Sequence, residues 1–449
     1  MSATPTETSK NPFSRLLAYF KGHPTGFYFF FWGELAERCS FYGMKVILIV
    51  YMTKTLGFKD GEATKWESYF TAAAFLTPLL GGWIADRYLG KYWTIVGFAI
   101  PYVIGNALMI FEGKYFLLAA MAIIAFGSGV IKPNISSLMG MTYDQQRPGQ
   151  DQLRSNAFMM FYWAINFGSL ISKFFMPILR NKVGPNIAFL LPTVLIATAL
   201  AIFALGKRYY ARDIPSRKKK LTLEENRERW TVFSRLLGVF VLIIVFWSTF
   251  LQKDNVWVYF IRDHIDLTIN GVEYKPDQFL FLNAFFILTL LPLAGWIYHV
   301  LEKRGIKLRP TDKMQLGFVF AALAPLTFVV VTLLPGTGHS IFWVVLAFFF
   351  LTIGEVLISP VGLELAFVAA PPTMKGFVTA CFLLTSFAGS TLNGLITPWY
   401  GETANGIRIL TPTMYFGFQV LALLIAMTAF YFIAIPFNRR LAEEQKTAL

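Results

Sequence analysis

Long apolar segments, each about the length of a membrane-spanning helix, alternate along the chain with short polar connectors. A helix that crosses the hydrocarbon core needs about 20 mostly apolar residues. Six such windows occupy residues 26–56, 68–88, 92–111, 115–141, 157–178 and 187–205. Six more occupy residues 232–260, 279–299, 316–334, 341–370, 377–395 and 414–437. The pattern predicts an all-α integral membrane protein of twelve transmembrane helices.

The polar and basic segments predict how the chain is divided. We expect an N-terminal tail (1–25), a six-helix bundle (26–206), a basic linker (207–231), a second six-helix bundle (232–440) and a C-terminal tail (441–449). Because Lys and Arg collect in cytoplasmic loops, their distribution puts both termini and the linker in the cytoplasm of a multi-pass inner-membrane protein. Two such bundles around a central cavity are the layout of the major facilitator fold.

Composition excludes several other classes of protein. The 449 residues are 55% hydrophobic and 17% aromatic, values typical of a membrane protein surrounded by lipid. The net charge of +14 does not indicate a nucleic-acid partner, because most basic residues lie between apolar segments. We find no motif for metal binding, for a nucleophile with its base, or for phosphate binding. The sequence therefore predicts no cofactor, no metal site and no enzyme activity.

Three closely spaced ionisable residues lie in the first half of the first apolar window. Glu34, Glu37 and Arg38 stand at positions i, i+3 and i+4, so a helix places them on one face. Each charge near the bilayer centre costs roughly 2.5–3.5 kcal/mol on the insertion scale. Such residues mark a substrate or ion path by default. A buried ion-pair staple between helices is the alternative interpretation.

Four segments carry a resemblance to a known family. Residues 33–43, GELAERCSFYG, resemble the E-x-x-E-R-F-x-Y-Y signature of the proton-dependent oligopeptide transporter (POT) family. Three further segments resemble motifs of the same family and occur in the same chain order: GSGVIKPN at 127–134, FYWAINFGS at 161–169 and GEVLISPVGL at 354–363. The resemblance implies a proton-coupled symporter that imports di- and tripeptides and peptide-like drugs by alternating access, working as a monomer.

A small peptide carries an ammonium group at one end and a carboxylate at the other. Arg38 and Lys132 are suited to the carboxylate, Arg as a bidentate donor and Lys as a point charge. Glu355, in the other half of the chain, is suited to the ammonium group. Asn166 and Asn283 each offer a donor and an acceptor to the peptide backbone. Without a ligand, we expect Lys132 and Glu355 to pair across the cavity.

The resemblance adds further site residues. It implies substrate contacts for Tyr42, Trp247 and Ser359. Glu34 and Glu37 are the favoured proton carriers beside Arg38, and Glu355 is third, because burial raises the pKa of a carboxyl group. Which of the first two carries the proton is left open.

Two pairs are predicted to act as gates. Residues 82–91, GWIADRYLGK, resemble the loop signature of major facilitator transporters, and we expect Asp86 and Arg87 to latch the cytoplasmic side. Lys45 is expected to pair with Asp254 as an outer gate.

Departures from the family pattern leave alternatives open. Cys39 and Phe41 stand at usually aromatic positions of the first motif, and Cys381 stands where tryptophan is common. These changes bear on specificity. A POT-fold carrier of another small anion would need the cations but would have less need for Glu355. A proton–drug antiporter would lack the matched set of Arg38, Lys132 and Glu355.

Overall fold

The computed structural model describes residues 22–213, 223–306, 308–368, 375–400 and 409–447. The predicted tails at 1–25 and 441–449 and the linker at 207–231 lie partly outside the described residues. The domain boundaries 26–206 and 232–440 remain predictions.

Twelve long helices make up most of the described chain, as the apolar windows predict. A helix satisfies every backbone hydrogen bond within its own segment, which lipid requires. The first six are α2 (Thr25–Lys54), α3 (Asp60–Ile84), α4 (Lys91–Leu108), α5 (Lys114–Gln146), α6 (Asp151–Val183) and α8 (Leu190–Leu205). The second six are α9 (Leu223–Phe250), α11 (Phe281–Lys303), α12 (Pro310–Leu333), α13 (Phe342–Val368), α14 (Lys375–Ile396) and α15 (Pro412–Thr447).

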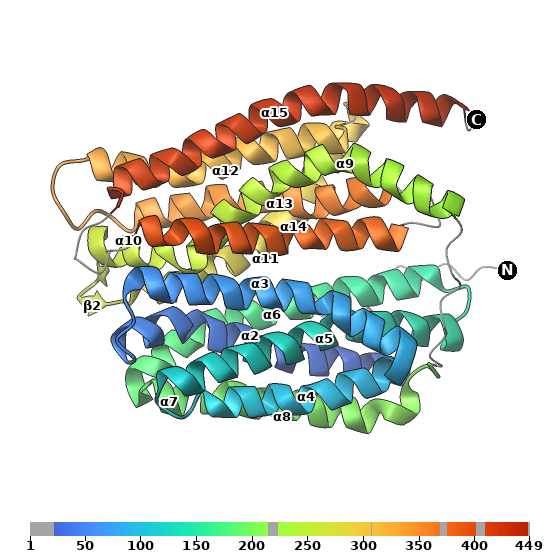
Figure 1. Ribbon diagram of the computed structural model, residues 1–449, viewed down its shortest axis with the longest axis horizontal. Coiled ribbons are helices and arrows are strands. Elements are labelled where there is room, and N and C mark those ends of the chain that lie inside the picture. Colours follow the sequence, from blue (N-terminus) through green and yellow to red (C-terminus); the bar gives the residue numbers. More distant parts are fainter. Residues whose placement is uncertain (1–21, 214–222, 307, 369–374, 401–408, 448–449) are drawn as a thin grey trace, which may run out of the picture.

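Short elements connect the long helices. They are the π-helical turn η1 (Ala85–Leu89), α7 (Pro185–Ala188), η2 (Gly206–Tyr209), η3 (Leu251–Asp254), α10 (Val256–His264), η4 (Pro276–Leu280) and η5 (Thr397–Trp399). A two-stranded antiparallel hairpin, β1 (Thr268–Ile269) with β2 (Val272–Glu273), follows α10. Figure 1 shows α7, α10 and the hairpin at one end of the molecule, opposite the start of α9 and the end of α15.

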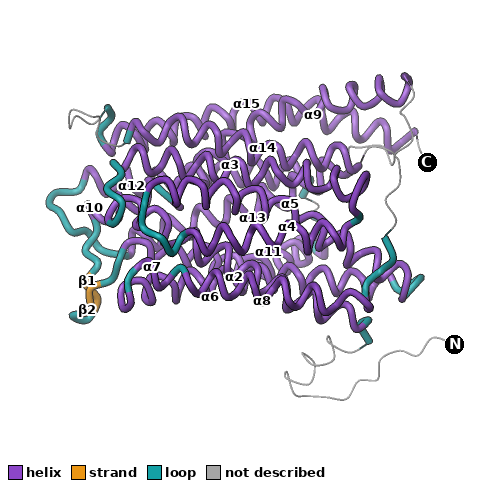
Figure 2. The backbone as a smooth tube through the Cα atoms, turned by 60° about the horizontal axis from the view of Figure 1, so that its bottom comes forward, coloured by secondary structure: helices purple, strands orange, loops and turns teal. Residues whose placement is uncertain are grey.

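The helices pack as two bundles. In the first, α2 contacts α6 and α8, and α5 packs between α3 and α4. In the second, α12 packs between α13 and α15, and α9 contacts α14 and α15. The bundles meet where α3 packs on α14 and α6 packs on α11. Figure 1 shows them as two layers, and Figure 2, in which the bundles overlap, shows that the long helices of both run in nearly the same direction. This arrangement confirms the predicted two-bundle, all-α fold.

The seventh predicted span, 232–260, is not one continuous helix. α9 ends at Phe250, η3 follows, and α10 begins only after Asn255. The break has a local cause, because the Asn255 side chain accepts a hydrogen bond from the Val256 backbone N–H at 2.6 Å and so caps α10. The break places Lys253 and Asp254 at a helix end that faces the cavity described below.

The outer surface is largely apolar. Eight helical segments in the described residues are long and apolar enough to cross a membrane. Large side chains such as Leu333, Phe432 and Leu421 are more than half exposed on it, at 71%, 66% and 57%. Apolar area on this scale on an isolated chain fits a lipid environment.

Candidate functional site

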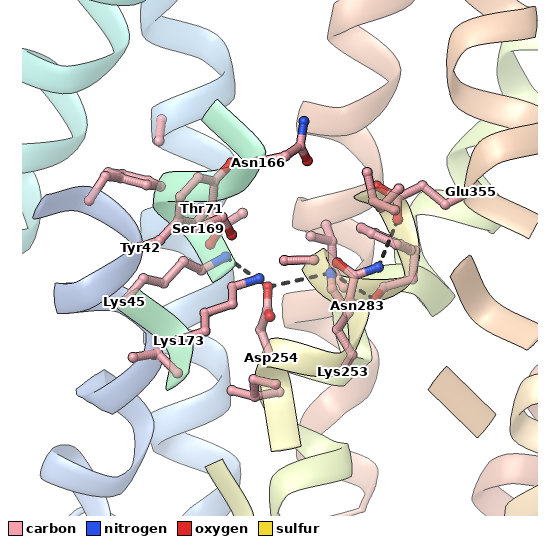
Figure 3. Close-up of a pocket in the computed structure, with 18 of the residues that line it drawn as sticks. Tyr42, Lys45, Thr71, Asn166, Ser169, Lys173, Lys253, Asp254, Asn283 and Glu355 are labelled. Carbon is pink, nitrogen blue, oxygen red and sulfur yellow. Dashed lines mark hydrogen bonds and ion pairs between the residues drawn. The ribbon is translucent and has the colours of Figure 1, made fainter. Parts of the chain in front are cut away.

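A cavity of about 230 Å³ lies between the two bundles. From the first bundle it is lined by charged and polar residues of α2, α3, α5 and α6: Tyr42, Lys45, Thr71, Lys132, Asn166, Ser169 and Lys173. From the second it is lined by Trp247, Lys253, Asp254, Asn283 and Glu355. Figure 3 shows the labelled side chains of both sets extending toward the space between the bundles.

The cluster of Glu34, Glu37 and Arg38 is buried in α2. Arg38 Nε lies 3.0 Å from Glu34 Oε1, and the guanidinium also pairs with Glu37. The three side chains are at most 5% exposed and do not form part of the cavity wall. The i, i+3, i+4 spacing thus unites them as predicted, but Arg38 does not reach the cavity in this conformation.

Phe41 separates that cluster from the cavity. Its ring lies 5.8 Å from the Arg38 guanidinium carbon and 4.2 Å from Lys132 Nζ, and it lines the cavity itself. Lys132 rests on the aromatic face, a favourable cation–π arrangement. A single aromatic ring therefore separates the protonatable cluster from the charged groups of the cavity.

Glu355 is held on the opposite wall by Asn283. The Asn283 amide donates to Glu355 Oε2 at 2.8 Å and to Thr352 Oγ1 at 3.1 Å. Asn283 thus orients the carboxylate as well as lining the cavity. The expected ion pair between Lys132 and Glu355 does not form in this structure, because each has another contact on its own bundle.

Polar contacts join the two bundles at the end of the cavity nearest α10. Lys45 Nζ lies 3.0 Å from Asp254 Oδ2 and 3.2 Å from Glu67 Oε1. Asn255 donates to Glu67 at 3.2 Å, which adds a second link between the two bundles. Farther out, Arg180 pairs with Asp277, and Arg262 pairs with Asp60 at 2.9 Å. This end of the cavity is closed by charge pairs, and the predicted partners Lys45 and Asp254 are among them.

Other predicted residues are placed differently. Asn166 and Trp247 line the cavity, although the Asn166 amide donates to Tyr162 O in its own helix at 3.0 Å. Ser359 lies one helical turn beyond Glu355 and does not line the cavity.

Asp86 and Arg87, the predicted cytoplasmic latch, lie within the first bundle. Asp86 pairs with Lys91 at 2.9 Å, and the Lys91 backbone N–H donates to Asp213 at 2.5 Å. The Arg87 guanidinium lies over the neighbouring Tyr88 ring. These contacts tie the 85–91 turn to the chain leaving the first bundle.

Three charged residues of the site were not predicted. Lys173 and Lys253 line the cavity, and Glu67 pairs with Lys45. Lys173 and Lys253 lie inside the apolar windows 157–178 and 232–260, and Glu67 directly precedes the window 68–88. The rule that an ionisable residue within a span indicates function would have found the two lysines.

Comparisons with known proteins agree with this architecture. A family model described as the POT family matches residues 92–234 and 219–414. The chain is 32% identical over 349 residues to "Peptide transporter family 1" of Drosophila melanogaster, covering 67% of this chain and 46% of that protein. It is 30% identical over 429 residues to dipeptide and tripeptide permease A of Proteus mirabilis, covering 83% and 86%. The chain spans about half the length of the animal relatives that it matches.

Solved structures show the same fold. An auto-inhibited POT family peptide transporter matches with a TM-score of 0.82 at 26% identity, covering 92% of this chain and 97% of that one. A mutant peptide transporter POT in complex with alafosfalin matches with a TM-score of 0.83 at 25% identity, covering 95% and 98%. The family match extends into both bundles and includes the Lys132 and Glu355 segments, and the fold agrees along almost the whole chain. The chain therefore belongs to the POT family of membrane transporters.

Proposed function

We propose that this protein is a proton-coupled symporter that imports di- and tripeptides across the inner membrane, with both termini in the cytoplasm and the monomer as the working unit. The observation that supports it most is the placement of opposite charges on the two bundles. Lys132 lines the cavity from the first bundle and Glu355 from the second. A peptide has an ammonium group and a carboxylate, so one molecule satisfies both.

Binding of a peptide across the cavity draws the bundles together. The carboxylate goes to Lys132 and the ammonium group to Glu355, while Asn166 and Asn283 offer hydrogen bonds to the backbone. A ligand shifts a conformational equilibrium only by its differential affinity for the two states. Contacts from both bundles exist together only when the bundles are close, and this supplies the differential affinity.

Proton coupling is assigned to the cluster behind Phe41. Arg38 is held by Glu34 and Glu37, two carboxylates against one guanidinium. A proton on either carboxyl group removes one competitor for Arg38. The guanidinium stays paired with the remaining carboxylate, and the N–H donors that it frees become available to the peptide carboxylate beside Lys132.

The charge pairs near α10 act as the outer gate. Lys45, Asp254 and Glu67 hold the bundles together while the cavity is closed at that end. These ion pairs separate only when a ligand or a proton stabilises a conformation in which the same charged groups have other partners.

The driving force is large enough for accumulation. One elementary charge that moves through about 100 mV gains about 2.3 kcal/mol. One pH unit adds about 1.4 kcal/mol. Together they allow roughly several-hundred-fold accumulation per proton.

Uptake of labelled Ala-Ala into proteoliposomes tests the proposal. We expect accumulation when a pH gradient and an inside-negative voltage are imposed together, and only equilibration when both are collapsed. Accumulation that ignores the pH gradient contradicts proton coupling. Absence of Ala-Ala uptake under every gradient contradicts peptide transport.

A further inference from the structure

Three of the six charged side chains on the cavity wall, Lys45, Lys253 and Asp254, form ion pairs with one another, and Glu67 beside them completes their charge balance. Lys45 Nζ lies 3.0 Å and Lys253 Nζ 3.7 Å from the same Asp254 oxygen. Lys45 also pairs with Glu67, at 3.2 Å. These groups close one end of the cavity and are already satisfied without a ligand.

The other three have no ion pair among the residues that the structure describes. Glu355 accepts a hydrogen bond from Asn283. Lys132 lies over the Phe41 ring at 4.2 Å, and Lys173 lies over the Tyr42 ring at 5.2 Å. The wall therefore offers a ligand one carboxylate and two ammonium groups.

Lys173 is the less expected of the two lysines. It projects from α6 into the same space as Lys45 and Asp254 (Figure 3), and only 8% of its surface is exposed. An aromatic face compensates only part of the cost of burying a charge. A buried ammonium group with no carboxylate within ion-pair distance among the described residues favours a ligand that brings one.

The net charge of the groups in and beside the cavity also favours a ligand with an additional carboxylate. When Glu34 or Glu37 carries a proton, the remaining carboxylate of that cluster is balanced by Arg38. Lys45 and Lys253 are balanced by Asp254 and Glu67. What remains is Lys132, Lys173 and Glu355, one positive charge in excess.

We propose that the cavity prefers peptides with an acidic side chain, in which two carboxylates and one ammonium group meet Lys132, Lys173 and Glu355. This inference rests on the proposed function and names its substrate class. An inorganic or organic anion without an amine fits less well, because it leaves the Glu355 carboxylate unpaired.

Competition against labelled Ala-Ala uptake tests the preference. The competitors are Ala-Glu and Glu-Ala, with Ala-Gln and Gln-Ala as neutral peptides of the same shape. The readout is the half-inhibitory concentration of the neutral peptide divided by that of its acidic match. This ratio does not depend on the amount of active protein. We expect at least one acidic peptide to bind about tenfold more tightly than its neutral match.

Two substitutions locate the effect. Lys173→Met should bring that ratio close to one, and Lys173→Arg should keep it high. Lys65→Met, at an exposed lysine of α3, is the matched control and should leave the ratio at its original value. If Lys173→Met carries no Ala-Ala, the same ratio is measured by calorimetric binding to the purified variant.

The outcomes separate the inference from the proposed function. Ratios of one or less in both pairs overturn the acidic preference while peptide transport stands, and so does a high ratio that survives Lys173→Met. No uptake of Ala-Ala by the unmodified protein overturns the proposed function, and the inference with it.

Discussion

Lys45 of α2 and Asp254 of η3 form a 3.0 Å ion pair that joins the two helix bundles at one end of the cavity. Both side chains are mostly buried, at 12% and 13% exposure. Breaking a buried pair by removing one partner typically costs 3–5 kcal/mol, because a charge is left uncompensated. The closure of this end should therefore depend strongly on Lys45.

Lys45→Met should open that end of the cavity. Glu67 loses its only cation among the described residues, and the pairing of Asp254 falls to Lys253 at 3.7 Å. We expect maleimide labelling of a Ser68→Cys reporter to rise several-fold and Ala-Ala uptake to fall at least tenfold, in a chain with Cys39 and Cys381 replaced. Ser68 is fully buried in the present conformation. Lys65→Met is the control, and equal labelling in both variants would count against a gate.

Asp277→Asn should destabilise the protein far more than Asp60→Asn. Both aspartates pair with an arginine at the end of the molecule near α10, but Asp277 is fully buried and Asp60 is 28% exposed. Arg262 also keeps a second partner, Asp263, at 2.7 Å. We expect a loss of about 3 kcal/mol or more for the buried pair and below about 1 kcal/mol for the exposed one. Thermal unfolding in detergent measures which variant loses more stability. Equal decreases in the unfolding temperature of the two variants would contradict the prediction.

The helices and several cavity residues could be predicted because membrane physics leaves few choices. An apolar window must be helical, and charges within it must avoid lipid. The sequence therefore predicts that Lys132 and Glu355 line a common cavity. The rotation of α2 was not predictable, because i, i+4 spacing shows which residues share a face but not what that face meets. Arg38 therefore meets Phe41 and two carboxylates instead of the cavity.

The remaining differences depend on local detail. Lys173 and Lys253 lie outside the four segments that resemble the family, so no motif indicates them. The break after α9 depends on a single cap by Asn255 within an otherwise helical window. Ser359 follows Glu355 by one turn, but the cavity wall does not extend that far along α13.

Glu37→Gln should uncouple transport from protons. A glutamine at this position cannot release a proton, and it removes one of the two carboxylates that hold Arg38. We expect uptake driven by a pH gradient to disappear while counterflow exchange of Ala-Ala survives. Glu34→Gln, tested in parallel, shows which carboxyl group carries the proton. Unchanged proton-driven uptake in both variants would remove the cluster from the mechanism.

Asn283→Ala should weaken binding through the peptide amino terminus. The Asn283 amide donates to Glu355 Oε2 at 2.8 Å and fixes the carboxylate on the cavity wall. Without it, we expect the KM for Ala-Ala to rise about tenfold, whereas weak inhibition by N-acetyl-Ala-Ala should change little because that ligand has no ammonium group. A double substitution with Glu355→Gln tests the coupling. If the effects of the two changes on the KM simply multiply, Asn283 does not act through Glu355.

Gly81→Ala and Gly82→Ala form a matched pair that tests the packing of α3 on α5. A Cβ at Gly81 would overlap the Val130 carbonyl and lie 2.6 Å from the Val130 Cα, whereas a Cβ at Gly82 meets nothing within 4 Å. Backbone atoms of a packed helix cannot move aside cheaply, so Gly81→Ala must separate the helices. Lys132 lies on α5 two residues beyond this contact, so the shift reaches the cavity. We expect Gly81→Ala to lower both thermal stability and Ala-Ala uptake severely. Gly82→Ala should retain both, because Ala has the better helix propensity. Equal behaviour of the two variants would show that α3 and α5 do not pack this closely in the membrane.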